Sequence, residues 1–175
     1  IETGFGVSAG VVRIDAITVQ PDGKILVGGY FNIYKGISQN NIARLSTTGN
    51  LDTSFAIGTG FNFPVNTIAI QTDGKIIVGG GFSTYNGTTP NRIARLNTNG
   101  SLDTSFNIGT GFSGILGNVE SISIQSDGKY LIGGYFTTYK GQPQNRIARL
   151  NGTTLSVADS SKKVIALYPN PVSET

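Results

Sequence analysis

One block of sequence occurs three times in this chain, almost letter for letter. The copies read ITVQPDGKILVGGYFNIYKGISQNNIARL, IAIQTDGKIIVGGGFSTYNGTTPNRIARL and ISIQSDGKYLIGGYFTTYKGQPQNRIARL. The pentapeptide LDTSF follows the first two copies, and IETGF at the start of the chain is a degenerate version of it. A tandem period of about fifty residues indicates a solenoid, a propeller or another array of equivalent units. The fold must therefore be one that a single short unit builds by stacking on copies of itself.

Each copy has the pattern of a small antiparallel sheet. Apolar and polar residues alternate up to an Asp-Gly pair, and an apolar run that contains a Gly-Gly pair follows it. Asp-Gly between two such runs is a strong hairpin signal, because both central residues of the tight turn need positive φ. IARL and LDTSF are expected to add a third and a fourth strand, and no window shows helical periodicity. The sequence predicts an all-β protein with four strands per unit.

Four-stranded units with a Gly-Gly pair after the second strand indicate β-propeller blades. The motif IxxQxDGKIxVGGxFxxYxGxxxNxIARLxxxGxLDxSF resembles the delta-60 repeat, a β-propeller repeat of large bacterial secreted and surface proteins. The resemblance implies three four-stranded antiparallel blades, at about 1–50, 51–101 and 102–157, in a repeat region that spans 1–158. Propellers usually close with about four to eight blades. We therefore expect a partial propeller from a longer array, half of a six-bladed ring that two copies complete, or an open stack; the unit boundary at Ile1 favours the first.

The end of the chain has a different pattern. After a linker at 159–165, the segment 166–175 reads ALYPNPVSET. Its apolar-Tyr-Pro-Asn-Pro-apolar string is similar to the start of the C-terminal sorting domain of the type IX secretion system. The signal residues are Leu167, Tyr168, Pro169, Asn170 and Pro171. The resemblance implies that the secretion machinery is a partner and that the protein is secreted or placed on the cell surface of a Gram-negative bacterium. A proline-stiffened linker is the alternative interpretation.

Composition narrows the chemistry of this chain. It contains no Cys, His, Met or Trp, which excludes thiol chemistry, soft-metal sites and imidazole catalysis. The net charge is only +3 and the basic residues are spread along the sequence, which argues against nucleic acid as a partner. No apolar run is long enough to span a membrane. The Asp-Gly motif lacks the further acidic ligands of a calcium loop, and we expect neither a metal nor another cofactor.

The residues that recur in every unit are expected to be architectural. An arginine and an acidic residue recur and are expected to form bidentate pairs that join neighbouring strands; they are Arg44, Arg95 and Arg149 with Glu2, Asp52 and Asp103. A Phe-x-x-Tyr element also recurs, and its tyrosines are Tyr34, Tyr85 and Tyr139. We expect these rings to wedge between blades. Exposed on one rim, they would instead stack against sugar rings.

Two carboxylates, Asp15 and Glu120, lie outside the repeated acidic positions and the tail, in comparable places on different units. A glycosidase needs two carboxylates about 5–9 Å apart, which such places provide only if both face a central channel. We therefore expect no enzymatic activity. The sequence favours a non-catalytic scaffold or adhesive segment that binds glycans or other surface proteins. A carbohydrate-binding propeller of a polysaccharide-degrading protein is the alternative, and a spacer that holds another domain away from the cell envelope is a third.

Overall fold

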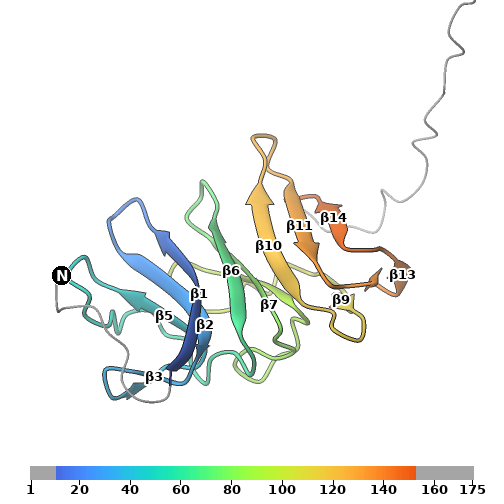
Figure 1. Ribbon diagram of the computed structural model, residues 1–175. Coiled ribbons are helices and arrows are strands. Elements are labelled where there is room, and N and C mark those ends of the chain that lie inside the picture. The colour runs from blue at the N-terminus through green and yellow to red at the C-terminus, as the bar shows by residue number, and fades with distance from the viewer. Residues whose placement is uncertain (1–10, 153–175) are drawn as a thin grey trace, which may run out of the picture.

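The computed structural model describes residues 11–152, and this part of the chain is built from β-strands (Figure 1). Its three main sheets, which we call blades 1 to 3, are each three-stranded and antiparallel. Blade 1 contains β1 (Val11–Val19), β2 (Ile25–Phe31) and β5 (Ile42–Leu45); blade 2 contains β6 (Val65–Ile70), β7 (Ile76–Gly80) and β8 (Ile93–Leu96); blade 3 contains β10 (Val119–Ile124), β11 (Tyr130–Gly134) and β14 (Ile147–Leu150). None of the described residues forms a helix of the length and apolarity that crossing a membrane requires.

Short strands connect the second and third strands of blades 1 and 3. In blade 1 they are β3 (Ile33–Tyr34) and β4 (Ile37–Ser38), which pair with each other. In blade 3 they are β12 (Thr138–Tyr139) and β13 (Gln142–Pro143), and β9 (Phe112–Ser113) pairs with β12 from the segment before the blade. The segments between blades are thus tied to the loops of the blade that follows them.

The Asp-Gly hairpins form at the predicted places with a longer turn than expected. In blade 1, Val19 pairs with Ile25, so the loop runs from Gln20 to Lys24. Gly23 has φ 81°, but Asp22 does not adopt positive φ, and its carboxylate accepts a hydrogen bond from the Lys24 amide at 3.1 Å. The aspartate therefore stabilises the loop through its side chain, and only the glycine uses left-handed backbone.

The prediction of four-stranded blades is wrong for blades 1 and 2. LDTSF contributes a single bridge to each sheet, Leu51 to Leu45 in blade 1 and Leu102 to Leu96 in blade 2. Directly after the first bridge, the Asp52 carboxylate accepts hydrogen bonds from the Ser54 amide at 3.0 Å and the Ser54 hydroxyl at 2.6 Å. This local bonding turns the backbone out of the sheet before a strand forms.

Adjacent blades pack face to face at the first glycine of each Gly-Gly pair. A Cβ added to Gly28 would lie 2.5 Å from Val65 Cγ1 of blade 2, and one added to Gly79 would lie 2.5 Å from Val119 Cγ1 of blade 3. We call each such position, where the first strand of the next blade sits against a bare backbone, a glycine socket. The close approach leaves no room for a side chain, which explains why this glycine recurs.

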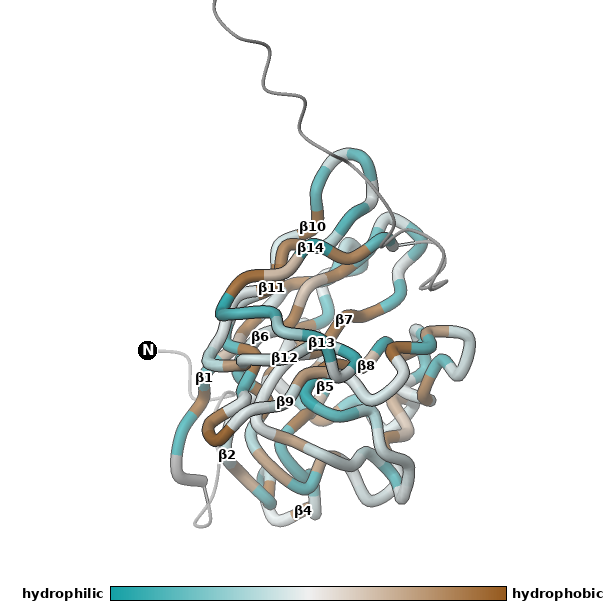
Figure 2. The backbone as a smooth tube through the Cα atoms, turned by 90° about the vertical axis from the view of Figure 1, so that its right-hand side faces the viewer, coloured by the Kyte–Doolittle hydropathy of each residue, from teal (hydrophilic) through white to brown (hydrophobic). Residues whose placement is uncertain are grey.

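The described core consists mainly of two apolar clusters, one at each interface between blades. The cluster between blades 1 and 2 includes Leu26 and Ile42 from blade 1 and Val65, Ile68 and Val78 from blade 2. The cluster between blades 2 and 3 is its counterpart, built on Ile77, Ile93 and Val119 among others. Apolar and hydrophilic segments alternate along the tube in Figure 2. The first strands neighbour one another, since β6 contacts both β1 and β10 (Figure 1). We call the side of the array that β1, β6 and β10 form its inner side.

Candidate binding pocket

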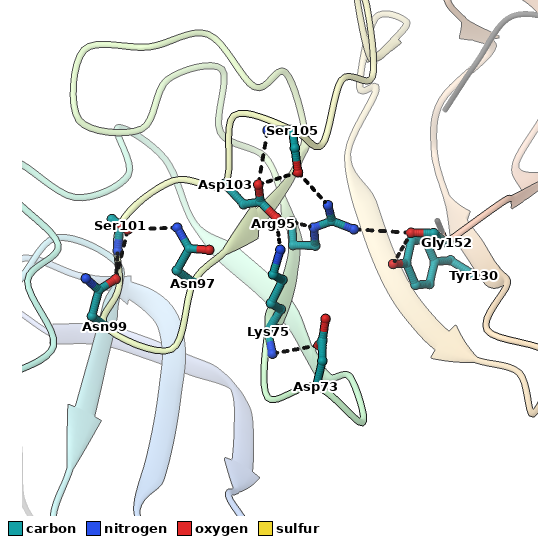
Figure 3. A network of polar contacts seen from close by, with 10 residues as sticks. All are labelled: Asp73, Lys75, Arg95, Asn97, Asn99, Ser101, Asp103, Ser105, Tyr130 and Gly152. Atoms are coloured by element: carbon teal, nitrogen blue, oxygen red, sulfur yellow. Dashed lines mark hydrogen bonds and ion pairs between the residues drawn. The ribbon is translucent and has the colours of Figure 1, made fainter. Parts of the chain in front are cut away.

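The recurring arginine is the centre of a polar network that joins blade 2 to blade 3 (Figure 3). Arg95 Nε donates to Asp103 Oδ2 at 2.7 Å, and its Nη2 donates to Ser105 Oγ at 3.1 Å. Its Nη1 donates to the backbone carbonyl of Gly152, which follows blade 3, at 3.1 Å. The guanidinium also lies over the Phe106 ring, 4.8 Å from its centroid. One side chain therefore secures its own blade and the next one.

Blade 1 repeats this arrangement. Arg44 Nε donates to Asp52 at 2.9 Å, and its Nη1 donates to the Thr98 carbonyl of blade 2 at 2.5 Å. The expected bidentate pairing is wrong, because only Nε contacts the carboxylate and the other two nitrogens bind a serine and a carbonyl. Arg149 is exposed and has no ion-pair partner among residues 11–152. Glu2 lies outside the described residues.

The carboxylates of Asp52 and Asp103 each bind a lysine in addition to the arginine. Lys75 Nζ is 2.7 Å from Asp103 Oδ2, and Lys24 Nζ is 2.9 Å from Asp52 Oδ2. For Asp52, the hydrogen bond from the Ser54 hydroxyl and then the one from Lys24 hold the pKa of the carboxyl well below its usual range. For Asp103, burial opposes ionisation, but hydrogen bonds from Lys75 and Ser105 outweigh it and lower the pKa well below the usual range. Both carboxylates are therefore ionised structural groups at neutral pH.

The recurring tyrosines lie inside the array. Tyr34 and Tyr85 are 2% and 1% exposed, and their hydroxyls donate to the carbonyls of Gly49 at 2.7 Å and Gly100 at 2.5 Å. Tyr139 is half-buried, with its ring 4.7 Å from that of Phe112. Burial raises the pKa of Tyr139 to about 12. The rings of Tyr34 and Tyr85 do not reach a rim where they could stack on a ligand.

Asp15 and Glu120 lie on inner strands, β1 and β10, at equivalent positions of their blades. Partial burial raises the pKa of Glu120, a hydrogen bond from Asn118 lowers it, and the negative charge of Asp15 raises it further. The two carboxyls are thus close enough to interact electrostatically. Asp15 is itself paired with Arg13, at 2.5 Å from Nε to Oδ1.

A pocket of about 430 Å³ lies between blades 1 and 2. Ligand pockets commonly have volumes of about 300–1,000 Å³, so this one is large enough for a small molecule or one or two sugar units. Its residues come from the end of β2 and the residue after it, the two residues before β5, the segment between the blades and the loop after β7. They are Tyr30, Phe31, Asn32, Asn40, Asn41, Thr59, Gly60, Phe61, Asn62 and Thr84. No charged residue is among them, so the pocket offers neutral hydrogen-bonding groups and aromatic carbon.

Asparagine side chains hold the walls of this pocket in place. Asn41 Nδ2 donates to the Phe61 carbonyl at 2.7 Å, and Asn40 Nδ2 donates to the Thr59 carbonyl at 2.8 Å. Asn62 Oδ1 accepts from the Thr84 amide at 2.9 Å. Within residues 11–152, the Asn32 side chain has no hydrogen-bond partner and is exposed, and the Tyr30 ring is 48% exposed. Side-chain hydrogen bonds therefore fix the walls of the pocket, and at least one amide and one aromatic ring are available to a ligand.

The pocket depends on residues that blade 1 does not share with blade 2. Arg92 stands where blade 1 has Asn41, and its Nη1 donates to the carbonyl of Gly81, which stands where blade 1 has Tyr30. In blade 2 a long side chain thus reaches from the position of Asn41 to the backbone at the position of Tyr30. Sequence reasoning missed Tyr30 and Asn41, but there was a signal: Asn-Asn at 40–41 replaces the Asn-Arg of the other two copies.

These features define the chain as an array of small antiparallel blades whose repeated residues form the joints between them. A family model for a β-propeller domain of unknown function, DUF5122, matches residues 20–55, 71–106 and 125–153, one stretch for each copy. The chain therefore belongs to the DUF5122 β-propeller family. No curated protein matches it in sequence. The sorting residues Leu167 to Pro171 and the linker at 159–165 lie outside the described residues.

Proposed function

We propose that this chain is a non-catalytic β-propeller scaffold that serves as an adhesive binding segment of a secreted or cell-surface bacterial protein. The observation that carries the proposal is the use of the recurring charged residues. In blades 1 and 2, Arg44 and Arg95 are buried and bound to a carboxylate of their own blade and a carbonyl of the next. Side chains used in this way hold neighbouring blades together and are not available for catalysis.

The resemblance to the delta-60 repeat and to a type IX sorting signal supports the proposed location. The direct test uses the full-length gene product in a Gram-negative bacterium that has this secretion system. Replacing Tyr168, Pro169 and Asn170 with alanine should leave the protein in the periplasm, as measured by cell fractionation and surface proteolysis. Unchanged delivery to the surface would contradict the assignment of the signal.

A second function, carbohydrate binding, is favoured by the pocket between blades 1 and 2. Its lining is uncharged, its polar groups are amides and hydroxyls, and Tyr30 provides an exposed ring at its edge. Neutral amides with a few placed hydrogen-bonding groups and an aromatic face suit a neutral ligand rich in hydroxyl groups. We therefore propose that this pocket, rather than the buried Tyr34 and Tyr85, is where a glycan binds.

Blade 2 supplies the substitutions that test this site. Asn41→Arg and Tyr30→Gly each introduce the residue that blade 2 already carries at the equivalent position, so the fold should accept them. Binding to neutral oligosaccharides on a glycan array, followed by calorimetry, should be lost in both variants. Tyr135→Gly, at the equivalent position of blade 3, is the matched control and should bind normally.

The outcomes separate the two proposals. If the unaltered chain binds no glycan, the carbohydrate function fails and the scaffold proposal stands. If the purified chain cleaves a glycan that it binds, and the cleavage is lost on Glu120→Gln substitution, the non-catalytic proposal fails.

A further inference from the structure

The outer face of blade 3 carries the same residues as the two buried interfaces, but they are exposed. Leu131 corresponds to Leu26 and Ile77, which are fully buried, yet it is 36% exposed. Ile147 corresponds to Ile42 and Ile93, also fully buried, and is 63% exposed. The equivalent apolar faces of blades 1 and 2 are buried at the two interfaces between blades, whereas this face of blade 3 is exposed. Blade 3 therefore carries one half of an interface, and the described residues do not supply the other half.

The socket on this face is also open. Around Gly28 and Gly79, an added Cβ would meet a valine of the next blade at 2.5 Å, but around Gly133 the nearest atom is Ser121 Cβ at 3.9 Å. Blade 3 therefore keeps the glycine that blade packing requires, and none of the described residues fills the socket.

The complementary part lies at the other end of the array, on β1. In blades 2 and 3, the first strands carry Ile68 and Ile122, which pack into the interfaces that face blades 1 and 2. Ile17 holds this position on β1 and is 68% exposed, whereas Ile68 is 8% exposed. Val19, two residues further along β1, is 64% exposed. The chain thus presents an open socket at one end and an unpacked first strand at the other.

We propose that a second copy of this chain docks on the glycine socket of blade 3 through its β1, in the geometry that joins blade 1 to blade 2. In that geometry Ile14 and Ile17 of the second copy, the counterparts of Val65 and Ile68, both lie against Gly133. The same contact covers Leu131 and Ile147. Continuity with the two internal interfaces argues for this occupant, because the same residue types already form the same contact twice. The described residues of two copies bring six blades together, within the usual range of about four to eight. A second contact of the same kind then closes a ring.

The polar contacts of the internal interfaces also have their counterparts at this junction. Arg44 and Arg95 donate to the carbonyls of Thr98 and Gly152 in the following blade. Arg149 is the equivalent arginine in blade 3, and Thr47 of the second copy supplies the equivalent carbonyl. Thr18 of blade 1 donates to the Ile68 carbonyl at 3.1 Å; Ser123 stands at the same position in blade 3 and faces the Ile17 carbonyl of the second copy.

The test is the mass of the chain in solution, measured by sedimentation equilibrium over a wide concentration range. The unaltered chain should have twice the mass of one copy. Gly133→Val fills the socket and Ile17→Asp places a charge on the first strand, and each variant alone should be monomeric. An equimolar mixture of the two should form a one-to-one pair, because one copy still offers a good strand and the other a good socket.

The mixture distinguishes this docking from any other association. If the unaltered chain stays monomeric, or if the variants dimerise as well as the unaltered chain, the proposal is wrong. Failure of the mixture to pair also overturns it. Circular dichroism checks that both variants are folded, and Ile147→Lys, an exposed position on the same face, replaces Gly133→Val if that variant is not.

Discussion

Replacing Asp103 with asparagine should destabilise the protein by about 3 kcal/mol. The carboxylate oxygen Oδ2 accepts from Arg95 Nε and from Lys75 Nζ, both at 2.7 Å. Hydrogen bonds to charged groups contribute about 1.5–3 kcal/mol each. We use the lower figure for both, because the Lys75 side chain is 31% exposed and an amide oxygen still accepts weakly. The two contacts together give about 3 kcal/mol, at the lower end of the cost of breaking a buried ion pair.

The assay is urea unfolding followed by circular dichroism, with the melting temperature as a second measure. For a chain of this size, about 3 kcal/mol corresponds to a decrease in Tm of roughly 6–12 °C. Asp127→Asn is the matched control. It removes the Asp127–Lys129 pair, whose side chains are 48% and 36% exposed, and should leave Tm unchanged because solvent screens such a pair. A loss below about 1 kcal/mol for Asp103→Asn, or equal losses in both variants, would refute the assignment of Arg95 and Asp103 as a joint.

Three further predictions test the paired carboxylates, the tyrosine hydroxyls and the glycine socket. The folded-state pKa values of Asp52 and Asp103 are lowered. The two carboxylates therefore stabilise the fold fully above their unfolded pKa of about 3.9, and this stabilisation is lost as the pH falls below it. Urea unfolding between about pH 2 and 6 should show a falling free energy of unfolding, and Asp103→Asn should make its pH dependence less steep. Tyr85→Phe should cost about 1 kcal/mol because it removes a buried hydrogen bond to Gly100. Tyr139→Phe should be neutral or stabilising, because that hydroxyl is buried and has no hydrogen-bond partner within residues 11–152; equal changes in Tm would contradict the placement of the two rings. Gly79→Ala should cost about 1–3 kcal/mol through overpacking, since its Cβ would lie 2.5 Å from Val119 Cγ1, and an unchanged Tm would contradict the socket.

The repeat allowed the sheets and their hairpins to be predicted from sequence, because Asp-Gly turns and alternating residues are local signals. The fourth strand could not be judged in this way. LDTSF has the composition of a strand, but the hydrogen bonds from Ser54 to Asp52 compete with the sheet, and periodicity does not weigh such competition. The Gly-Gly pair was expected after the second strand, but it lies within that strand in each blade: β7 and β11 end on it, and β2 continues past it to Phe31. The sequence does not tell that the first glycine of the pair, as at Gly28, lies against the next blade.

The pocket could not be found in a search for what the copies share. Two of its lining residues, Tyr30 and Asn41, are replaced by Gly81 and Arg92 at the equivalent positions of blade 2. A search for conserved positions among the three copies does not detect such differences. The tyrosines illustrate the opposite difficulty. Tyr34 and Tyr85 recur in a regular pattern, but a pattern in sequence does not tell which side of a blade a ring occupies. The burial of Tyr85 follows from packing against the segment that joins blades 1 and 2, where the Phe61 ring centroid is 4.3 Å from that of Tyr85.

The arginine joint has a consequence for how such a protein grows. The acceptor of each arginine is a main-chain carbonyl oxygen: that of Thr98 for Arg44 and that of Gly152 for Arg95. Every residue type carries that oxygen, so mutations in the receiving loop leave the connection intact as long as the loop keeps its path. A newly duplicated stretch of gene would therefore encode a module already able to hold its neighbour, and its loops could then diverge toward new ligands without loosening the array.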